Sequence, residues 1–347
     1  MKNNVDLQTF NSFGFNATAK LFVEINDLAE LRQLIQTPEF MQEKHLILGG
    51  GNNILFTHDT FDGIVILMNN KGIEVIHEDG DDVIVRAQAG EDWPEFVRFC
   101  VDQGWYGVEN LAHIPGKVGA APVQNIGAYG MELKDSFLQC RAMNLSTGQT
   151  QVFTNEACMF GYRESIFKHE LKGQYVITSV DFQLAKQGEL NLEYGNIKSY
   201  LEQHGISNPT LRQLHDAICA IRDVKLPDLK QLGCAGSFFK NPVIGKEQFD
   251  ALQKEHPDMP HYEEPDGRVK VPAGWLIEHS GPSTGSDAVS WKGWRDGHVG
   301  VYEKQALVLV HYGGGKGQDI VALAQRIQSS VEEKFGIKIS PEVNFVS

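Results

Sequence analysis

Residues 114–130, which read IPGKVGAAPVQNIGAYG, limit the possible folds of this chain more than any other segment. Four glycines, two prolines and several alanines leave it too few bulky side chains to build a core. Surface loops are usually polar, yet Lys117 is the only charge here. Glycine allows close approach of the backbone to a ligand, Gln124 and Asn125 offer amides to polar ring edges, and Tyr129 offers a flat face. We therefore favour a ligand cradle over a long surface loop.

A second glycine-rich segment, GGGNN at residues 49–53, follows the apolar residues 45–48, which are typical of a strand. A glycine run after a strand can present a nest of backbone N–H groups to a pyrophosphate. The alternative is a tight turn. The segment lacks the GxGxxG spacing, and residues 54–56 do not open a helix, which disfavours a Rossmann-type dinucleotide site.

Composition excludes several classes of protein. The 347 residues carry a formal net charge of -14, which argues against a general nucleic-acid surface. The five cysteines show no CxxC spacing and the histidines no HExxH pattern, so we expect a reducing compartment and no metal site. The N-terminus lacks a signal-peptide pattern, and no apolar run is long enough to span a membrane. These features predict a cytoplasmic protein with neither nucleic acid nor membrane as partner.

Hydrophobic periodicity predicts an α+β chain with mostly β character in its middle part. The predicted strands are residues 45–48, 64–68, 73–77, 83–89, 138–145, 175–184 and 307–311. The predicted helices are residues 26–36, 93–102, 210–222, 273–279 and 318–335. Asp92 and Thr210 are the expected N-caps of the second and third helices. Residues 339–345 alternate apolar and polar side chains, which predicts an extended tail with Val343 and Phe345 buried.

Three residues could carry chemistry, although each has a simple structural alternative. Arg163, in GYRES, could bind a carboxylate or phosphate, or form a surface ion pair. Ser237, in AGSFFKNP, could be a reactive hydroxyl beside a dry pocket made by Phe238 and Phe239, or a turn serine; the GxSxG elbow is absent. Glu342, between Pro341 and Val343, could be a functional acid or a paired structural charge. For each residue taken alone, the structural alternative is favoured.

Taken together, the segments resemble the family of UDP-N-acetylenolpyruvoylglucosamine reductases, the flavoenzymes of peptidoglycan precursor synthesis. The most specific matches are residues 114–130, GYRESIFK at 161–168 and AGSFFKNP at 235–242. Weaker matches, in the family's order, cover nearly the whole chain: residues 11–14, 48–56, 110–131, 160–169, 225–228, 305–310 and 341–343.

The resemblance implies a bipartite FAD-binding region of the vanillyl-alcohol-oxidase type and a third, α/β substrate-binding domain. The implied boundaries are residues 1–70 with the tail 338–347 returning to them, residues 71–226, and residues 227–337. The implied reaction is the reduction of UDP-N-acetylglucosamine enolpyruvate by NADPH through FAD, in a protein expected to be a cytoplasmic monomer. No histidine lies in residues 49–53, so we expect the FAD to be bound non-covalently.

The resemblance also assigns site residues. The catalytic ones are Arg163, Ser237 as proton donor, and Glu342. The substrate contacts are Tyr194, on a loop that closes over the substrate, Lys225 and Asn241. The residues expected to bind FAD are Gly49, Gly50, Gly51, Asn52, Asn53, Pro115, Gly116, Gly119, Ala120, Gln124, Asn125, Gly127, Ala128 and Tyr129.

The chain departs from the family pattern in places. Asn52 stands where a serine is common, Cys234 replaces a polar residue, and residues 281–300 form a longer stretch than in some relatives. Two other functions stay open. One is a flavin oxidase of the same fold, against which the missing turn histidine argues. The other is a non-catalytic flavin-binding or nucleotide-sugar-binding protein, against which the joint presence of Arg163, Ser237 and Glu342 argues.

Overall fold

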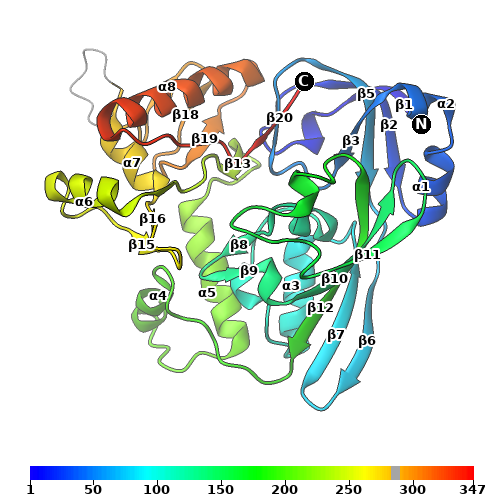
Figure 1. The fold of residues 1–347 in the computed structure, drawn as a ribbon, viewed down its shortest axis with the longest axis horizontal. Helices are drawn as coiled ribbons and strands as arrows, with labels where there is room; N and C mark the ends of the chain where they lie inside the picture. Colours follow the sequence, from blue (N-terminus) through cyan, green and yellow to red (C-terminus); the bar gives the residue numbers. More distant parts are fainter. Residues whose placement is uncertain (283–289) are drawn as a thin grey trace. The chain divides into compact units, whose positions relative to one another are not determined.

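A computed structural model describes residues 1–282 and 290–347 of the chain (Figure 1). These residues form two compact units. Unit 1 comprises residues 1–5, 19–51 and 62–223, and unit 2 comprises residues 6–18, 52–61 and 224–347. The division into three domains expected from the family stays a prediction. Part of the long stretch 281–300 falls on residues 283–289, outside the described residues.

Unit 1 contains two sheets, each with its own core. The first has the strand order β1 (Lys2–Asp6), β2 (Thr18–Ile25), β5 (Thr60–Met68), β3 (Lys44–Leu48). Its core includes Ile25, Ile64 and Ile66 with residues of α1 (Leu28–Leu34) and α2 (Pro38–Gln42). The second has the order β11 (Thr150–Thr154), β10 (Phe137–Asn144), β12 (Tyr175–Ala185), β7 (Asp82–Gln88), β6 (Ile73–Asp79).

The second sheet and its helices bury the largest apolar cluster of unit 1. Its members come from β7, β10 and β12 and from α3 (Trp93–Asp102), α4 (Ile197–Gln203) and α5 (Leu211–Lys225). Helices α3 and α5 begin within one residue of their predicted starts, whereas α4 was not predicted and one predicted cap is wrong. Thr210 accepts from Gln213 N at 3.2 Å, whereas Asp92 makes no side-chain cap hydrogen bond. Its carboxylate pairs with Lys71 and Lys117 instead, at 3.1 and 2.9 Å, because ion pairing competes with capping for the same oxygens.

Unit 2 combines small sheets with a long helix. The main sheet runs β13 (Gly233–Ser237), β19 (Val308–His311), β18 (Val299–Val301), β17 (Arg295–Asp296), and a smaller one runs β14 (Val243–Ile244), β16 (Val269–Lys270), β15 (Tyr262–Glu263). Its helices are α6 (Lys246–Glu255), α7 (Ala273–Ser280) and α8 (Gly317–Phe335). Helix α8 runs beside α7, β18 and β19, and its predicted apolar stripe is buried (Figure 1).

The C-terminal tail is tied into unit 2 by a short parallel pairing. Strand β20 (Asn344–Val346) lies beside β4 (Ile54–Phe56), with Asn344 opposite Ile54. Val343 is buried as predicted, but the prediction for Phe345 is wrong, since 47% of its side chain is exposed. In β20 it is Val346 that is buried, so the alternation of the tail shifts by one residue after Val343.

Candidate active site

Within unit 1, the start of the first glycine-rich segment lies beside residues 117–120 of the second. A Cβ on Gly49 would come within 3.1 Å of the Ala120 Cβ, and a Cβ on Gly119 would come within 2.5 Å of the Ala89 Cβ. Larger side chains would therefore push the segments apart. Gly51 has φ +66°, a left-handed conformation that favours glycine. This close-packed backbone fits the cradle that an extended, flat cofactor such as FAD requires.

The end of the cradle holds strained backbone. A 3₁₀ helix (Val118–Gln124) is followed by Asn125 at φ +45°, β8 (Gly127–Ala128), Tyr129 at φ +48° and β9 (Met131–Glu132). Non-glycine residues with positive φ are uncommon, and they persist only where surrounding contacts hold them. Such positions concentrate at functional sites, which agrees with the ligand-cradle interpretation.

Asn125 corrects one part of that interpretation. Its side chain is fully buried, and Nδ2 donates to Glu132 Oε2 at 3.0 Å and to Gly161 O at 2.9 Å. Its Oδ1 accepts from Lys134 N at 3.0 Å. The prediction that this amide contacts a ring edge is therefore wrong, because its hydrogen-bonding groups are used inside the protein. Asn125 instead braces the cradle against the turn that carries Arg163.

Arg163 lies directly on the cradle backbone. The hydrogen bonds Gly161 N to Glu164 O, 3.0 Å, and Glu164 N to Gly161 O, 3.2 Å, close a tight turn in which Arg163 has φ +58°. Its Nη2 donates to Gly127 O at 2.7 Å. A Cβ on Gly127 would lie 2.8 Å from Nη1, so glycine is needed for this seat. Arg163 is thus a precisely held cation beside the cradle.

A second arginine in unit 1, Arg222 on α5, is not among the residues predicted from the sequence. Its one hydrogen bond to a described residue runs from Nε to His113 O at 3.1 Å, and no carboxylate among residues 1–282 and 290–347 lies within ion-pair distance. Burial lowers the pKa of Arg222, Tyr129 and Asp223 act in the opposite direction, and the charge on Arg163 lowers it further. Arg222 is therefore a desolvated cation close to Arg163.

Tyr194 meets the cradle through two glycines. A Cβ on Gly130 would lie 3.2 Å from the Tyr194 Cβ, and one on Gly195 would lie 3.7 Å from Tyr129 Cδ1. The Tyr194 side chain is 42% exposed, as a residue that contacts a ligand should be before binding. Burial raises the pKa of the Tyr129 hydroxyl, so Tyr129 stays neutral at ordinary pH.

In unit 2, Ser237 stands at the end of β13 with an exposed side chain. The pairing of β13 with β19 is irregular between Cys234 and Ser237, where Gly236 takes φ +68°. Ser237 Oγ has no hydrogen-bond partner among the described residues, which leaves it available. Phe238 and Phe239 do not form the dry pocket expected beside it. They are 0% and 1% exposed and belong to the core of unit 2.

The tail runs antiparallel to the segment after Ser237, which brings Glu342 to the same part of unit 2. Glu342 N donates to Phe238 O at 2.7 Å, and Lys240 N donates to Ser340 O at 2.9 Å. Asn53, expected to bind FAD, also contacts this tail, because Asn344 N donates to its carbonyl at 3.0 Å. The structure thus groups Ser237 with Glu342 in unit 2, while Arg163 and Tyr194 lie in unit 1.

Two predicted substrate contacts, Asn241 and Lys225, lie in unit 2. Asn241 lines a cavity of about 490 Å³ together with Lys240 and Lys338. Its Oδ1 accepts from Ala273 N at 2.9 Å at the start of α7, and this bond fixes the orientation of the amide. Burial lowers the pKa of Lys225, which lies at the end of α5.

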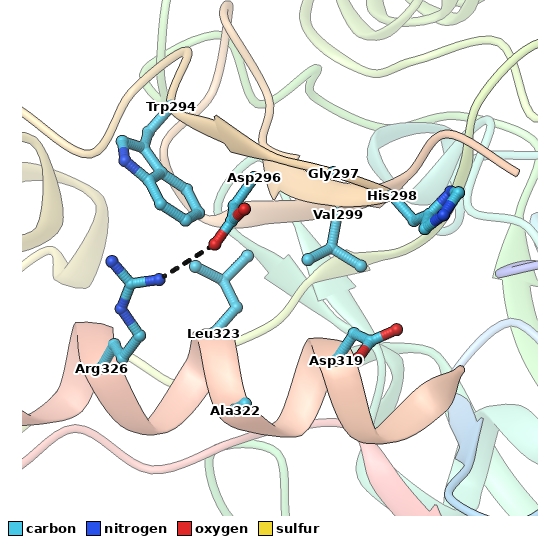
Figure 2. A pocket seen from close by; sticks show the side chains of 9 residues that line it. All are labelled: Trp294, Asp296, Gly297, His298, Val299, Asp319, Ala322, Leu323 and Arg326. Carbon is cyan, nitrogen blue, oxygen red and sulfur yellow. Dashed lines mark ion pairs between the residues drawn. The ribbon is translucent and has the colours of Figure 1, made fainter. Parts of the chain in front are cut away.

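A second cavity in unit 2, of about 290 Å³, lies between the β17–β18 hairpin and α8 (Figure 2). Its polar side chains are already engaged. Asp296 pairs with Arg326 at 3.5 Å, and His298 Nδ1 contacts Gly313 O at 2.6 Å. Asp319 accepts from Lys316 N at 2.7 Å. None of the predicted site residues lines this cavity, so it is not the candidate active site.

Two family models match this chain and define its class of protein. A family model for an FAD binding domain matches residues 19–154, which contain both glycine-rich segments. A model for the C-terminal domain of UDP-N-acetylenolpyruvoylglucosamine reductase matches residues 228–346, which contain Ser237 and Glu342. The chain is therefore a flavoprotein of the α+β class, as predicted.

Curated relatives define the family. The chain is 48% identical, over 100% of its length and 99% of the relative's, to the UDP-N-acetylenolpyruvoylglucosamine reductase of Flavobacterium johnsoniae. It is 46% identical to that of Chromobacterium violaceum, over 98% and 97% of the two chains. The chain belongs to the UDP-N-acetylenolpyruvoylglucosamine reductase family, as its motifs predict. The crystal structure of the Thermus caldophilus reductase shares the fold, with a TM-score of 0.66 at 21% identity over 99% of this chain and 98% of that one.

Proposed function

We propose that this chain reduces the enolpyruvyl group of UDP-N-acetylglucosamine enolpyruvate to give UDP-N-acetylmuramate, with NADPH as reductant, in the synthesis of peptidoglycan precursors. The observation that carries the proposal is the 48% identity over the full length to a reductase of that name. The seat of Arg163 on the cradle backbone supports it, because a fixed cation beside a flavin site suits a substrate that carries a carboxylate.

FAD, when bound, supplies the transfer of hydride from NADPH to the substrate. The residues that would hold it are those of the two adjacent glycine-rich segments, with Asn125 acting as a brace rather than as a side-chain contact. Gly49 and Gly119 let these segments pack closely, because a Cβ on either glycine would press on Ala120 or Ala89. Residues 49–53 contain no histidine, so non-covalent binding stays our prediction.

Arg163 and Arg222 would hold the substrate's carboxylate. Hydride addition at C3 makes C2 part of a dianionic enolate, and fixed positive charge lowers the energy of that anion most in a desolvated site. Arg163 is oriented by Gly127 O, and Arg222 keeps its terminal amino groups unpaired by carboxylates of the described residues. Both guanidiniums can therefore donate to the developing anion.

Ser237 would then deliver a proton to C2. Its hydroxyl is exposed and unbonded among the described residues, and an enolate carbon is basic enough to take a proton from a serine whose alkoxide is stabilised. Glu342, tied to Phe238 by its own N–H, would orient the groups around this step. Tyr194, Lys225 and Asn241 would contact the nucleotide sugar.

The cytoplasm and a monomeric state stay predictions. All five cysteines are free, which suits a reducing compartment. Among the described residues, no helix has the length and apolar character to cross a bilayer.

Flavin absorbance during the two half-reactions tests the function. NADPH alone should bleach the flavin, and the colour should return only when UDP-N-acetylglucosamine enolpyruvate is added without air. Colour that returns with oxygen but not with this substrate would instead indicate an oxidase. Flavin that NADPH never bleaches would indicate a binding protein.

Ser237→Ala should leave the bleaching step intact and slow the return of colour by about 10² to 10⁴-fold, the usual cost of losing a general acid. Ser237→Cys keeps an ionisable proton and should lose less. A Ser237→Ala protein that reoxidises at the wild-type rate would make the serine structural.

A further inference from the structure

Asn110 joins the cradle to the loop that carries Tyr194. It lies in a short 3₁₀ helix (Glu109–Leu111) of unit 1, and its side chain is fully buried. Its Nδ2 donates to Tyr129 O at 2.9 Å and to Asn191 O at 2.9 Å. One amide group thus bridges two segments that are far apart in sequence.

The bridge acts where the two segments are already in contact. Tyr194 packs at Gly130, directly after Tyr129, and Asn191 Oδ1 accepts from Glu193 N at 3.2 Å at the start of the loop. The carbonyls of Tyr129 and Asn191 are part-buried, and backbone oxygens withdrawn from water gain from a protein donor. Asn110 supplies both donors and so fixes the distance between loop and cradle.

The oxygen of the same amide makes no comparable hydrogen bond. Asn110 Oδ1 is buried and has no hydrogen-bond partner among the described residues. Burying an unpaired carbonyl oxygen costs free energy, so the two hydrogen bonds that Nδ2 donates must outweigh that cost. These bonds join the loop to the cradle, which an apolar side chain could not do.

We propose that Asn110 is a positioning residue that holds the Tyr194 loop in the conformation that binds the nucleotide-sugar substrate. This inference rests on the proposed function. Without the bridge, the loop would spend only part of its time in that conformation, and the apparent affinity would fall by the same fraction. Reduction of the flavin by NADPH precedes substrate binding, so we expect it to proceed without this conformation of the loop.

Asn70 offers a matched control. It is also buried, its Nδ2 donates to Thr178 O at 2.9 Å and to Gln88 Oε1 at 3.1 Å, and its Oδ1 is likewise buried without a described partner. It braces the second sheet of unit 1 and contacts none of the predicted site residues through these bonds. Asn110→Leu and Asn70→Leu therefore remove the same chemistry from two places.

The experiment compares KM, kcat, the dissociation constant of the substrate and urea unfolding in both variants. Asn110→Leu should raise KM and the dissociation constant about tenfold, as expected if the loop is competent one-tenth of the time. Its kcat and its flavin reduction by NADPH should stay near wild type. Asn70→Leu should unfold at lower urea but keep the wild-type KM. Equal KM changes in both variants, or an unchanged KM in Asn110→Leu, would overturn the proposal.

Gly130→Ala provides a second route should Asn110→Leu fail to fold. Its Cβ would press on Tyr194 and on Asn191 Nδ2, each at 3.2 Å, and would displace the loop without removing the Asn110 side chain, although φ +78° at Gly130 also strains the turn. The same rise in KM is expected, and a wild-type KM here would count against the loop's role. If wild-type enzyme itself shows no substrate-dependent reoxidation, the proposed function fails rather than this inference.

Discussion

Unit 1 holds one fully buried and one partly buried charge, and their surroundings are built in opposite ways. At the sheet, the fully buried Asp181 accepts from Arg86 Nε at 2.7 Å, from Arg141 Nη1 at 3.0 Å and from Gln139 Nε2 at 2.7 Å. On α5, the desolvated Arg222 donates one hydrogen bond to a backbone carbonyl and has no carboxylate partner among the described residues.

The difference separates a structural charge from one kept for a ligand. Burying an unpaired charge is costly, so a charge that serves only the fold is surrounded by partners, as Asp181 is. Burial acts to raise the pKa of Asp181, but the hydrogen bonds from Arg86, Gln139 and Arg141 outweigh it and hold the pKa below its usual range. At Arg222 burial dominates and lowers the pKa, which leaves binding capacity for an incoming anion.

The largest expected effect is on stability at the sheet. Asp181→Ala removes the partner of two arginines, and breaking a buried ion pair in this way typically costs about 3–5 kcal/mol. Urea unfolding should show this loss, while substrate KM in the folded fraction stays at the wild-type value. Glu95→Ala is the control, because its pair with Arg98 is exposed and should contribute about 1 kcal/mol or less. Equal losses in the two variants would mean that Asp181 is no more important than a surface ion pair.

A substitution beneath Arg163 should lower activity by a larger factor than it lowers stability. The Cβ of Gly127→Ala would lie 2.8 Å from Arg163 Nη1 and 2.9 Å from Met131 O, so the guanidinium must move. A displacement of about 1 Å in a catalytic group can cost about 10²-fold in rate. Gly161→Ala is the control in the same turn, since its Cβ meets Glu164 Cβ at an ordinary 3.5 Å. Full activity in Gly127→Ala would refute the assigned role of the Arg163 seat.

The contrast also shows what could be predicted from sequence. The longer helices, the main strands of the second sheet of unit 1, the two glycine-rich segments and the family followed from local pattern, because periodicity and glycine content are local properties. The short helices α2 and α4, helix α6 and most of the short strands were not predicted. Arg163 was identified only through its motif, since GYRES gives no sign that Gly127 seats the guanidinium. The braces were not predictable, because Asn125 and Asn110 act through partners that tertiary structure brings close.

Arg222 did leave a trace in the sequence. It follows Ile218 by four residues and so continues the apolar stripe of the helix, which begins with Leu211 and Leu214. A charged residue in the apolar stripe of a helix either is withdrawn from water for a functional reason or lies at the frayed end of the helix, where water reaches it. The sequence could not decide between these, because the surroundings of Arg222 come from other segments of the chain, such as His113.

Removing the charge of Arg222 should weaken substrate binding without lowering the unfolding free energy. Arg222→Met keeps the length of the side chain and should raise substrate KM at least about tenfold, since a hydrogen bond to a charged group contributes about 1.5–3 kcal/mol. Its unfolding free energy should match wild type or exceed it, because a desolvated charge is lost. Arg212→Met, which removes an exposed partner of Asp102 from the same helix, should change neither quantity. A destabilised Arg222→Met with normal KM would make Arg222 a structural residue like Arg86.

The smallest expected effect is a difference in pH dependence between the stability contributed by Asp181 and the substrate binding contributed by Arg222. The folded pKa of Asp181 lies below its unfolded value of about 3.9, so its stabilisation is fully present above that value and is lost as pH falls through the folded pKa. The difference in unfolding free energy between wild type and Asp181→Asn should therefore be constant from about pH 6 to 8 and shrink below about pH 4. The KM ratio between wild type and Arg222→Met should not follow that profile, because an arginine stays protonated across this range. Unfolding curves and KM values from pH 3 to 8, over the range in which each protein stays folded, test both. A stability gap at Asp181 that persists unchanged at pH 3 would show that packing, rather than charge, holds the sheet together there.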